Sequence, residues 1–199
     1  MHIIDDLTAA FSKLPGIGPR QARRFVYHLL DCPAGERDAL ARLIQNISGS
    51  ISQCSSCMRF ADNAKPLCSY CKDISRDPAV LAVIEKDQDL IAFEKTHEFK
   101  GHYFVLGGTL TLSGKNRVRE KDFDRVIKDK ISKGLSEVIL ALAATTEGEM
   151  TTDYLKDRLL PYRDTLTISV LGRGLATGSE LEYADKETLS NAYRNRKIT

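Results

Sequence analysis

The sequence predicts an α+β protein with a helical N-terminal domain, a cysteine-based metal module, an α/β domain and a short C-terminal segment. Apolar residues recur at helical spacing through residue 52. Four cysteines then form two closely spaced pairs, and from Pro78 onward short apolar runs alternate with helical patterns. We expect these four parts to occupy residues 1–53, 54–71, 78–174 and 175–199.

The composition is that of an ordinary globular protein, since 42% of the 199 residues are hydrophobic and 28% are charged. No apolar run approaches the length of a membrane span, so we expect no membrane association. The formal net charge is only +2, so binding to nucleic acid would need a local basic patch. The sequence shows no secretory signal, and its cysteine spacing is typical of metal-binding thiolates; both features predict a cytoplasmic protein.

The N-terminal region has the pattern helix, Gly-x-Gly turn, helix. Residues 3–13 predict a helix with Ile3, Ile4, Leu7 and Phe11 on one face. The segment Leu14–Arg20 contains Gly16 and Gly18, and Pro19 suits the first turn of a second helix that runs to about Leu30. Its expected buried residues are Ala22, Phe25, Val26, Leu29 and Leu30.

This helix-hairpin-helix pattern favours DNA binding. Glycines let the backbone approach a ligand closely, and the amides of the turn and the helix N-terminus suit a phosphate. Such contacts carry no sequence specificity. The expected DNA-binding residues are Lys13, Gly16, Gly18, Arg20, Arg23 and Arg24. The alternative is an ordinary tight turn followed by a solvated basic helix.

Residues 34–52 predict a third helix whose apolar stripe we expect to belong to the core. The stripe consists of Leu40, Leu43, Ile44, Ile47 and Ile51.

The four cysteines predict a structural Zn²⁺ site. Cys54 and Cys57 form one Cys-x-x-Cys pair, Cys68 and Cys71 form the other, and ten residues, Met58 to Leu67, separate them. Four thiolates leave no ligand position open, so we expect one zinc ion per chain with a structural role. The alternatives are two disulfides or a redox Cys-x-x-Cys. Cys32 is left over, and we expect it to be a buried or half-buried free thiol.

The second half of the chain predicts a mostly parallel sheet covered by helices on both faces. The expected strands are residues 79–84, 103–106, 137–142 and 165–171, and the expected helices are 88–96, 123–131 and 150–160. Asp185 is the expected cap of a last helix that runs through Tyr193. Glu85, Glu147 and Glu149 follow the first and third strands, where ligand sites of such sheets gather.

These three glutamates resemble the acidic residues of the Toprim domain of topoisomerases and primases, which can hold Mg²⁺. The paired acids are Glu-x-Glu here, whereas catalytic Toprim domains carry Asp-x-Asp, and no candidate nucleophile stands out. We therefore expect no Mg²⁺ and no catalysis at this place. The alternatives are an acidic docking surface or solvated loop acids.

Taken in order, these parts resemble the RecR family of bacterial recombination mediators over nearly the whole chain. The most specific stretches are Leu14–Arg20, the four cysteines, Glu147–Glu149 and Gly172–Thr188. The sequence departs from the usual pattern of the family in two stretches, Lys86–Asp89 and Thr109–Asn116.

The resemblance implies a protein that is not an enzyme. Family members act with RecO and RecF to load RecA onto single-stranded DNA at gaps and breaks, and they form tetrameric rings that can encircle DNA. If the family's DNA contacts are carried over to this chain, single- or double-stranded DNA at the nucleoid would be contacted by Arg20, Arg23 and Arg24. Glu85, Glu147 and Glu149 would contact RecO. The competing hypothesis is a Mg²⁺-dependent Toprim nuclease or primase-like enzyme.

Overall fold

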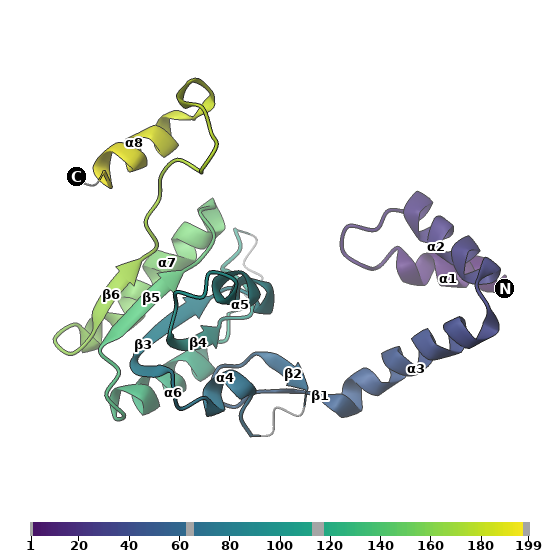
Figure 1. Ribbon diagram of the computed structural model, residues 1–199, viewed down its shortest axis with the longest axis horizontal. Helices are drawn as coiled ribbons and strands as arrows, with labels where there is room; N and C mark the ends of the chain where they lie inside the picture. Colours follow the sequence, from purple (N-terminus) through teal and green to yellow (C-terminus); the bar gives the residue numbers. More distant parts are fainter. Residues whose placement is uncertain (1, 63–65, 113–117, 197–199) are drawn as a thin grey trace. The chain divides into compact units, whose positions relative to one another are not determined.

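The computed structural model describes residues 2–62, 66–112 and 118–196, and it divides into two compact units, residues 1–51 and 52–199 (Figure 1). The loop expected between the cysteine pairs lies partly outside the described residues, as do residues 113–116 of the second departure from the family pattern. Within the described part of the chain, no helix is both long and apolar enough to cross a membrane.

The first unit contains helices α1 (Ile3–Phe11), α2 (Pro19–Asp31) and α3 (Ala34–Ser50). The hairpin of α1 and α2 is confirmed, and Phe11 meets Phe25 edge to face with ring centroids 6.0 Å apart. Ala22 and Val26 are fully buried between the helices. The expected apolar faces are only partly correct, because Ile3, Leu7 and Leu30 are exposed at the ends and margins of this small two-helix contact.

The prediction that the α3 stripe belongs to the core is wrong for the single chain. Leu43 is 69% exposed and Ile44 58%, and α3 contains no buried residue. Leu40 and Ile47 are also exposed, and Ile51 lies beyond the helix, in a short strand. Helical periodicity identifies a face that avoids water, but it does not say whether the covering surface belongs to the same chain.

The second unit begins with the cysteine module, which consists of β1 (Ile51–Gln53), β2 (Phe60–Asp62) and the short helix α4 (Ser69–Lys72). The two short strands pair with each other, and the cysteines lie in the turn between them and around α4. Neither strand was among the predicted elements, because three residues carry too little periodic signal.

The expected parallel sheet is confirmed. Its strands are β3 (Asp77–Ile84), β4 (Gly101–Val105), β5 (Glu137–Ala141) and β6 (Thr167–Val170), in the order β4-β3-β5-β6. Every pairing is parallel: Val83 lies opposite Phe104 on one side and opposite Leu140 on the other. The carboxyl ends of β3 and β5 therefore lie side by side.

Helices α5 (Asp87–Glu94), α6 (Glu120–Ile131) and α7 (Thr146–Leu159) connect the strands, and the 3₁₀ turn η1 (Leu160–Tyr162) follows α7. Alternate strand residues separate two cores. On one face Leu81, Val83 and Phe104 pack against α6 and α7. On the other face Ala82, Ile84 and Tyr103 pack against Leu90 of α5 and Tyr70 of the cysteine module. The helix expected over residues 150–160 begins earlier, at Thr146, because Thr145 caps it by accepting a hydrogen bond from the amide of Gly148.

The C-terminal segment contains the 3₁₀ turn η2 (Leu181–Tyr183) and α8 (Lys186–Arg194). Asp185 accepts hydrogen bonds from the amides of Glu187 and Thr188, so the predicted cap is confirmed.

Candidate functional site

The hairpin turn gives its two glycines different roles. Gly16 has φ +78°, in the left-handed region that favours glycine. Gly18 has an ordinary extended conformation and is the N-cap of α2. A Cβ atom at Gly18 would meet no described atom within 4 Å. No contact among the described residues therefore requires glycine at position 18.

The N-terminus of α2 has no side-chain cap. Gly18 offers no side-chain acceptor, Pro19 has no amide proton, and the first turn contains no acidic residue. The amide of Ala22 donates to the carbonyl of Gly18. The amides of Arg20 and Gln21 come before that bond and have no acceptor within the helix. This end can accept an anion.

All the basic side chains predicted to bind DNA are exposed: Lys13, Arg20, Arg23 and Arg24. Arg24 reaches Gln21 at 3.5 Å on its own helix, and Arg23 lies 3.8 Å from Asp5 of α1. Both partners in the Arg23–Asp5 pair are more than 60% exposed, so the pair contributes little and leaves Arg23 free to contact another anion. Asp5, on the neighbouring helix, was not among the predicted site residues.

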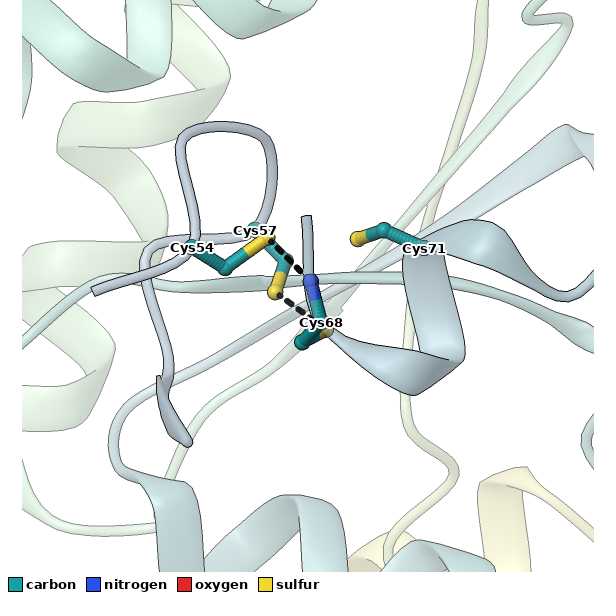
Figure 2. Close-up of side chains that lie close together, drawn as sticks. All are labelled: Cys54, Cys57, Cys68 and Cys71. Atoms are coloured by element: carbon teal, nitrogen blue, oxygen red, sulfur yellow. Dashed lines mark hydrogen bonds between the residues drawn. The ribbon is translucent and has the colours of Figure 1, made fainter. Parts of the chain in front are cut away.

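The structure brings the four predicted metal-ligating cysteines together (Figure 2). Their sulfur atoms all lie within 4.8 Å of one another, and Cys57 Sγ is 3.5 Å from Cys68 Sγ. A tetrahedral zinc site with bonds of about 2.3 Å needs sulfurs about 3.8 Å apart, so the cluster fits Zn²⁺ closely. Cys54, Cys57 and Cys68 are buried, and Cys71 is half-buried.

The electrostatics of the cluster favour a bound cation. Hydrogen bonds from the three other cysteines lower the pKa of Cys54, whereas the same set of contacts raises the pKa of Cys57. The four sulfurs therefore compete, and they cannot all be thiolates unless a cation neutralises them. All five cysteines are free thiols, and Cys32 is half-buried with its sulfur 3.5 Å from His28 Nε2.

The cysteine module is attached to the edge of the sheet. The amide of Val105 in edge strand β4 donates to the carbonyl of Cys57 at 2.8 Å. Arg119 donates to the carbonyls of both Met58 and Val105 at 2.9 Å. Met58 has φ +61° and places its side chain in the core. The guanidinium groups of Arg59 and Arg76 both contact the ring of Tyr70, each 4.8 Å from its centroid.

The three predicted glutamates lie at the carboxyl ends of β3 and β5, but two are paired within the chain. Lys86 Nζ is 2.6 Å from the carboxylate of Glu85. Arg173 forms a short ion pair with Glu149 in the first turn of α7. Arg173, which the sequence prediction missed, follows β6 and also lies 3.9 Å from Glu187 of α8.

Glu147 forms no ion pair with any described residue. The cysteines are the one group of three or more His, Cys, Asp or Glu side chains in the described ranges whose ligand atoms converge closely enough for a metal ion.

These features define a protein that carries a helix-hairpin-helix unit, a four-cysteine module and a parallel α/β domain in one chain. Family comparison matches residues 4–48 to the RecR helix-hairpin-helix, residues 79–172 to the Toprim domain and residues 174–197 to the RecR C-terminal region. The chain belongs to the RecR family of recombination proteins.

Curated relatives extend over nearly the whole chain. Recombination protein RecR of Cutibacterium acnes is 37% identical over 97% of this chain and 94% of its own length. Recombination protein RecR of Saccharopolyspora erythraea is 39% identical over 98% of this chain and 96% of its own length. Recombination protein RecR of Mycobacterium bovis is 36% identical over 98% of this chain and 97% of its own length. The protein therefore has a role in DNA recombination and repair.

Proposed function

We propose that the protein is a non-catalytic mediator that binds DNA through the α1–α2 hairpin and acts with RecO and RecF to load RecA onto single-stranded DNA. The observation that carries the proposal is the uncapped N-terminus of α2, beside exposed Arg20, Arg23 and Arg24. RecO, RecF and RecA come from the family resemblance. The cytoplasm, a reducing compartment, suits the free thiols.

DNA phosphate is the ligand that fits the hairpin. The turn offers the amides of Arg20 and Gln21, and Gly18 leaves open space in front of them. The N-terminus of α2 is flanked in the sequence by the other predicted DNA-binding residues, Lys13, Gly16, Arg20, Arg23 and Arg24. Contacts of this kind are to the sugar–phosphate backbone, so we expect similar affinity for all sequences.

The metal in this proposal is Zn²⁺, one per chain, held by Cys54, Cys57, Cys68 and Cys71. The spacing of the sulfurs and the set of four thiols support zinc. The metal would fix the module on strand β4 and has no open ligand position for catalysis.

The Toprim acids are proposed to be a partner surface rather than a Mg²⁺ site. Arg173 already supplies a cation to Glu149, and Lys86 does so for Glu85. A basic surface of RecO would compete with these two side chains for Glu85, Glu147 and Glu149. Capture of RecO should weaken with salt and with Glu147→Lys, whereas Asp164→Lys, at an exposed acid after η1, is the matched control.

The alternative function is a Mg²⁺-dependent nuclease or primase-like enzyme, favoured by the match to the Toprim domain. Nicking or primer synthesis by the pure protein that requires Mg²⁺ and is lost in Glu149→Gln would establish it.

Assembly into a ring is the last part of the proposal. The exposed apolar face of α3, with Leu40, Leu43, Ile44 and Ile47, is a surface that a second copy can cover. Gathering several hairpins would raise weak single contacts to useful avidity.

The test is a salt titration of DNA affinity for wild type and for Arg20→Ala/Arg24→Ala. For each phosphate that the variant no longer neutralises, the salt slope should fall by about 0.9 on duplex DNA, with weaker binding to all sequences. Lys121→Ala/Lys128→Ala removes the same charge from exposed positions on α6 and is the control. Coincident curves for the hairpin variant and wild type would refute the hairpin site and direct attention to the basic tail at Arg194, Arg196 and Lys197, of which Lys197 lies outside the described residues.

A further inference from the structure

Helix α6 carries a buried lysine that no carboxylate neutralises. Lys130 is 9% exposed, and no carboxylate of the described residues lies within 4 Å of its ammonium nitrogen. Its neighbour Asp129 is paired with Lys133 at 2.7 Å. The stem of Lys130 is buried, whereas its ammonium group keeps contact with solvent in a cavity and has no carboxylate of the described residues beside it.

Lys130 lines a cavity of about 390 Å³ on which the cysteine module also borders. The charged and titratable groups around the cavity are Cys71, His102, Arg125, Asp129, Lys130 and Lys133.

Most of these groups have their charge balanced or are neutral. Arg125 is paired with Asp122 at 2.9 Å and also donates to the carbonyl of Ser55 at 3.2 Å. His102 has a buried Nδ1 without a partner, and burial lowers its pKa, so the ring is neutral at pH 7. With Asp129 and Lys133 paired, only Lys130 remains as an uncompensated cation.

The cysteine cluster would provide the negative charge that Lys130 lacks. Four thiolates around one Zn²⁺ carry a formal charge of −2, and Cys71 of that cluster lines the same cavity. Burial lowers the pKa of Lys130, and the nearby Cys71 and Cys57 oppose part of this shift. An anion from outside would have to enter beside this −2 charge, so the cluster itself is the better partner.

We propose that Lys130 is the counter-charge of the zinc tetrathiolate, a positioning residue that stabilises the metal-loaded module from the Toprim domain. The inference rests on the proposed zinc site. Because Val126 and Ile127 of α6 pack in the main core, the pair would link metal binding to the packing of the α/β domain. Such outer partners typically change metal affinity about 10–100-fold when they are removed.

The inference predicts opposite effects of one substitution in the two metal states. Lys130→Met removes the charge but keeps a long apolar side chain. With zinc bound, the variant loses the partner of the −2 cluster. Without zinc, the cluster does not hold the fixed charge of −2, so the same substitution removes no such partner, and the metal-free protein should be as stable as wild type or more stable.

The experiment uses the full chain as wild type, Lys130→Met, Lys130→Arg and the control Lys128→Met, an exposed lysine on the same helix. Zinc content, zinc affinity by chelator competition at fixed pH, and thermal unfolding with and without chelator are measured. We expect zinc affinity about 10–100-fold weaker in Lys130→Met. We also expect near wild-type affinity in Lys130→Arg and Lys128→Met, and loss of stability in Lys130→Met only with zinc bound.

Each other outcome is decisive. Wild type without zinc would refute the proposed metal site itself. Wild type with zinc and an unchanged affinity in Lys130→Met would refute only the role of Lys130. An equal loss of stability with and without zinc, or failure of both Lys130→Met and Lys130→Arg to fold, would make Lys130 a packing residue. Failure of Lys130→Met alone, rescued in Lys130→Arg, would support the charge pairing.

Discussion

The two glycines of the hairpin separate a structural requirement from a binding requirement. Gly16 is needed by the turn, because φ +78° strains any residue with a Cβ atom. Gly18 has open space around it and an ordinary backbone conformation. In the proposed function, its small size lets an external group approach the N-terminus of α2.

Gly18→Ser should therefore separate stability from DNA binding. Serine is a better N-cap than glycine, so we expect the free energy of unfolding to rise by a few tenths of a kcal/mol. The hydroxyl oxygen would accept from the amides proposed to bind phosphate, so DNA affinity should fall. Thermal unfolding and DNA titration of the same preparation check both. Unchanged DNA affinity would show that the amides do not contact DNA.

At the metal site, the sequence predicts the ligands but not their supports. The Cys-x-x-Cys spacing is local, so Cys54 and Cys57 can be recognised without the fold. Arg119 and Arg125 contact the same turn from 61 and 70 residues away in the sequence, and no periodicity reports such contacts. Met58 is equally hidden, because a methionine in a left-handed turn is not a sequence signal.

Among the elements, the cysteine module has a clear structural task. Edge strand β4 would otherwise offer unpaired backbone groups to other chains. The carbonyl of Cys57 accepts from the amide of Val105, and Arg119 covers the carbonyl of Val105. The cysteine module therefore protects one edge of the sheet.

Removal of zinc by a chelator should loosen this edge first. We expect the amide of Val105 to exchange its hydrogen roughly two- to tenfold faster, as the loss of one hydrogen bond worth about 0.5–1.5 kcal/mol implies. The amides of β5 lie inside the sheet and should change little. Hydrogen exchange measured by mass spectrometry distinguishes the two strands. Equal acceleration in β4 and β5 would mean that the metal stabilises the whole domain instead.

Arg173, which follows β6, links α7 and α8. It pairs with Glu149 of α7, approaches Glu187 of α8, and its carbonyl accepts from Asn195. Arg173→Met should loosen α8, shown by faster proteolysis near Lys186–Arg194, and cost at most about 1 kcal/mol because the pair is half-exposed. It should not create Mg²⁺-dependent nuclease activity. Cleavage by the variant would mean that Arg173 blocks a competent metal site.

The parallel sheet was predictable because β3, β4 and β5 are largely buried and read as nearly continuous apolar runs. The order β4-β3-β5-β6 was not, since pairing depends on contacts between distant segments. The domain boundaries at residues 53, 71 and 174 stay predictions. The acids after β3 and β5 were placed correctly, but their partners Lys86 and Arg173 were not foreseen.

At the scale of the whole molecule, α3 would determine, in the proposed assembly, how many hairpins act together. Its apolar face was predicted correctly as a stripe and wrongly as core, because a single chain leaves it exposed. An exposed row of leucine and isoleucine side chains indicates a surface between molecules. If that surface joins copies of this chain, DNA affinity depends on α3 as well as on the hairpin.

Leu43→Glu tests this dependence without touching the hairpin. Leu43 is 69% exposed, so the substitution should leave the stability of the single chain nearly unchanged. A charge in the apolar face should dissociate the oligomer, which is measured by mass in solution. Loss of avidity should then weaken DNA binding by about 10²–10⁴-fold, although Arg20 and Arg24 are intact. Gln45→Glu adds the same charge at an exposed polar position of α3 and should change neither mass nor affinity. A monomeric Leu43→Glu with wild-type DNA affinity would show that one hairpin suffices, and a variant that keeps its wild-type mass would show that α3 is covered by something other than a second copy.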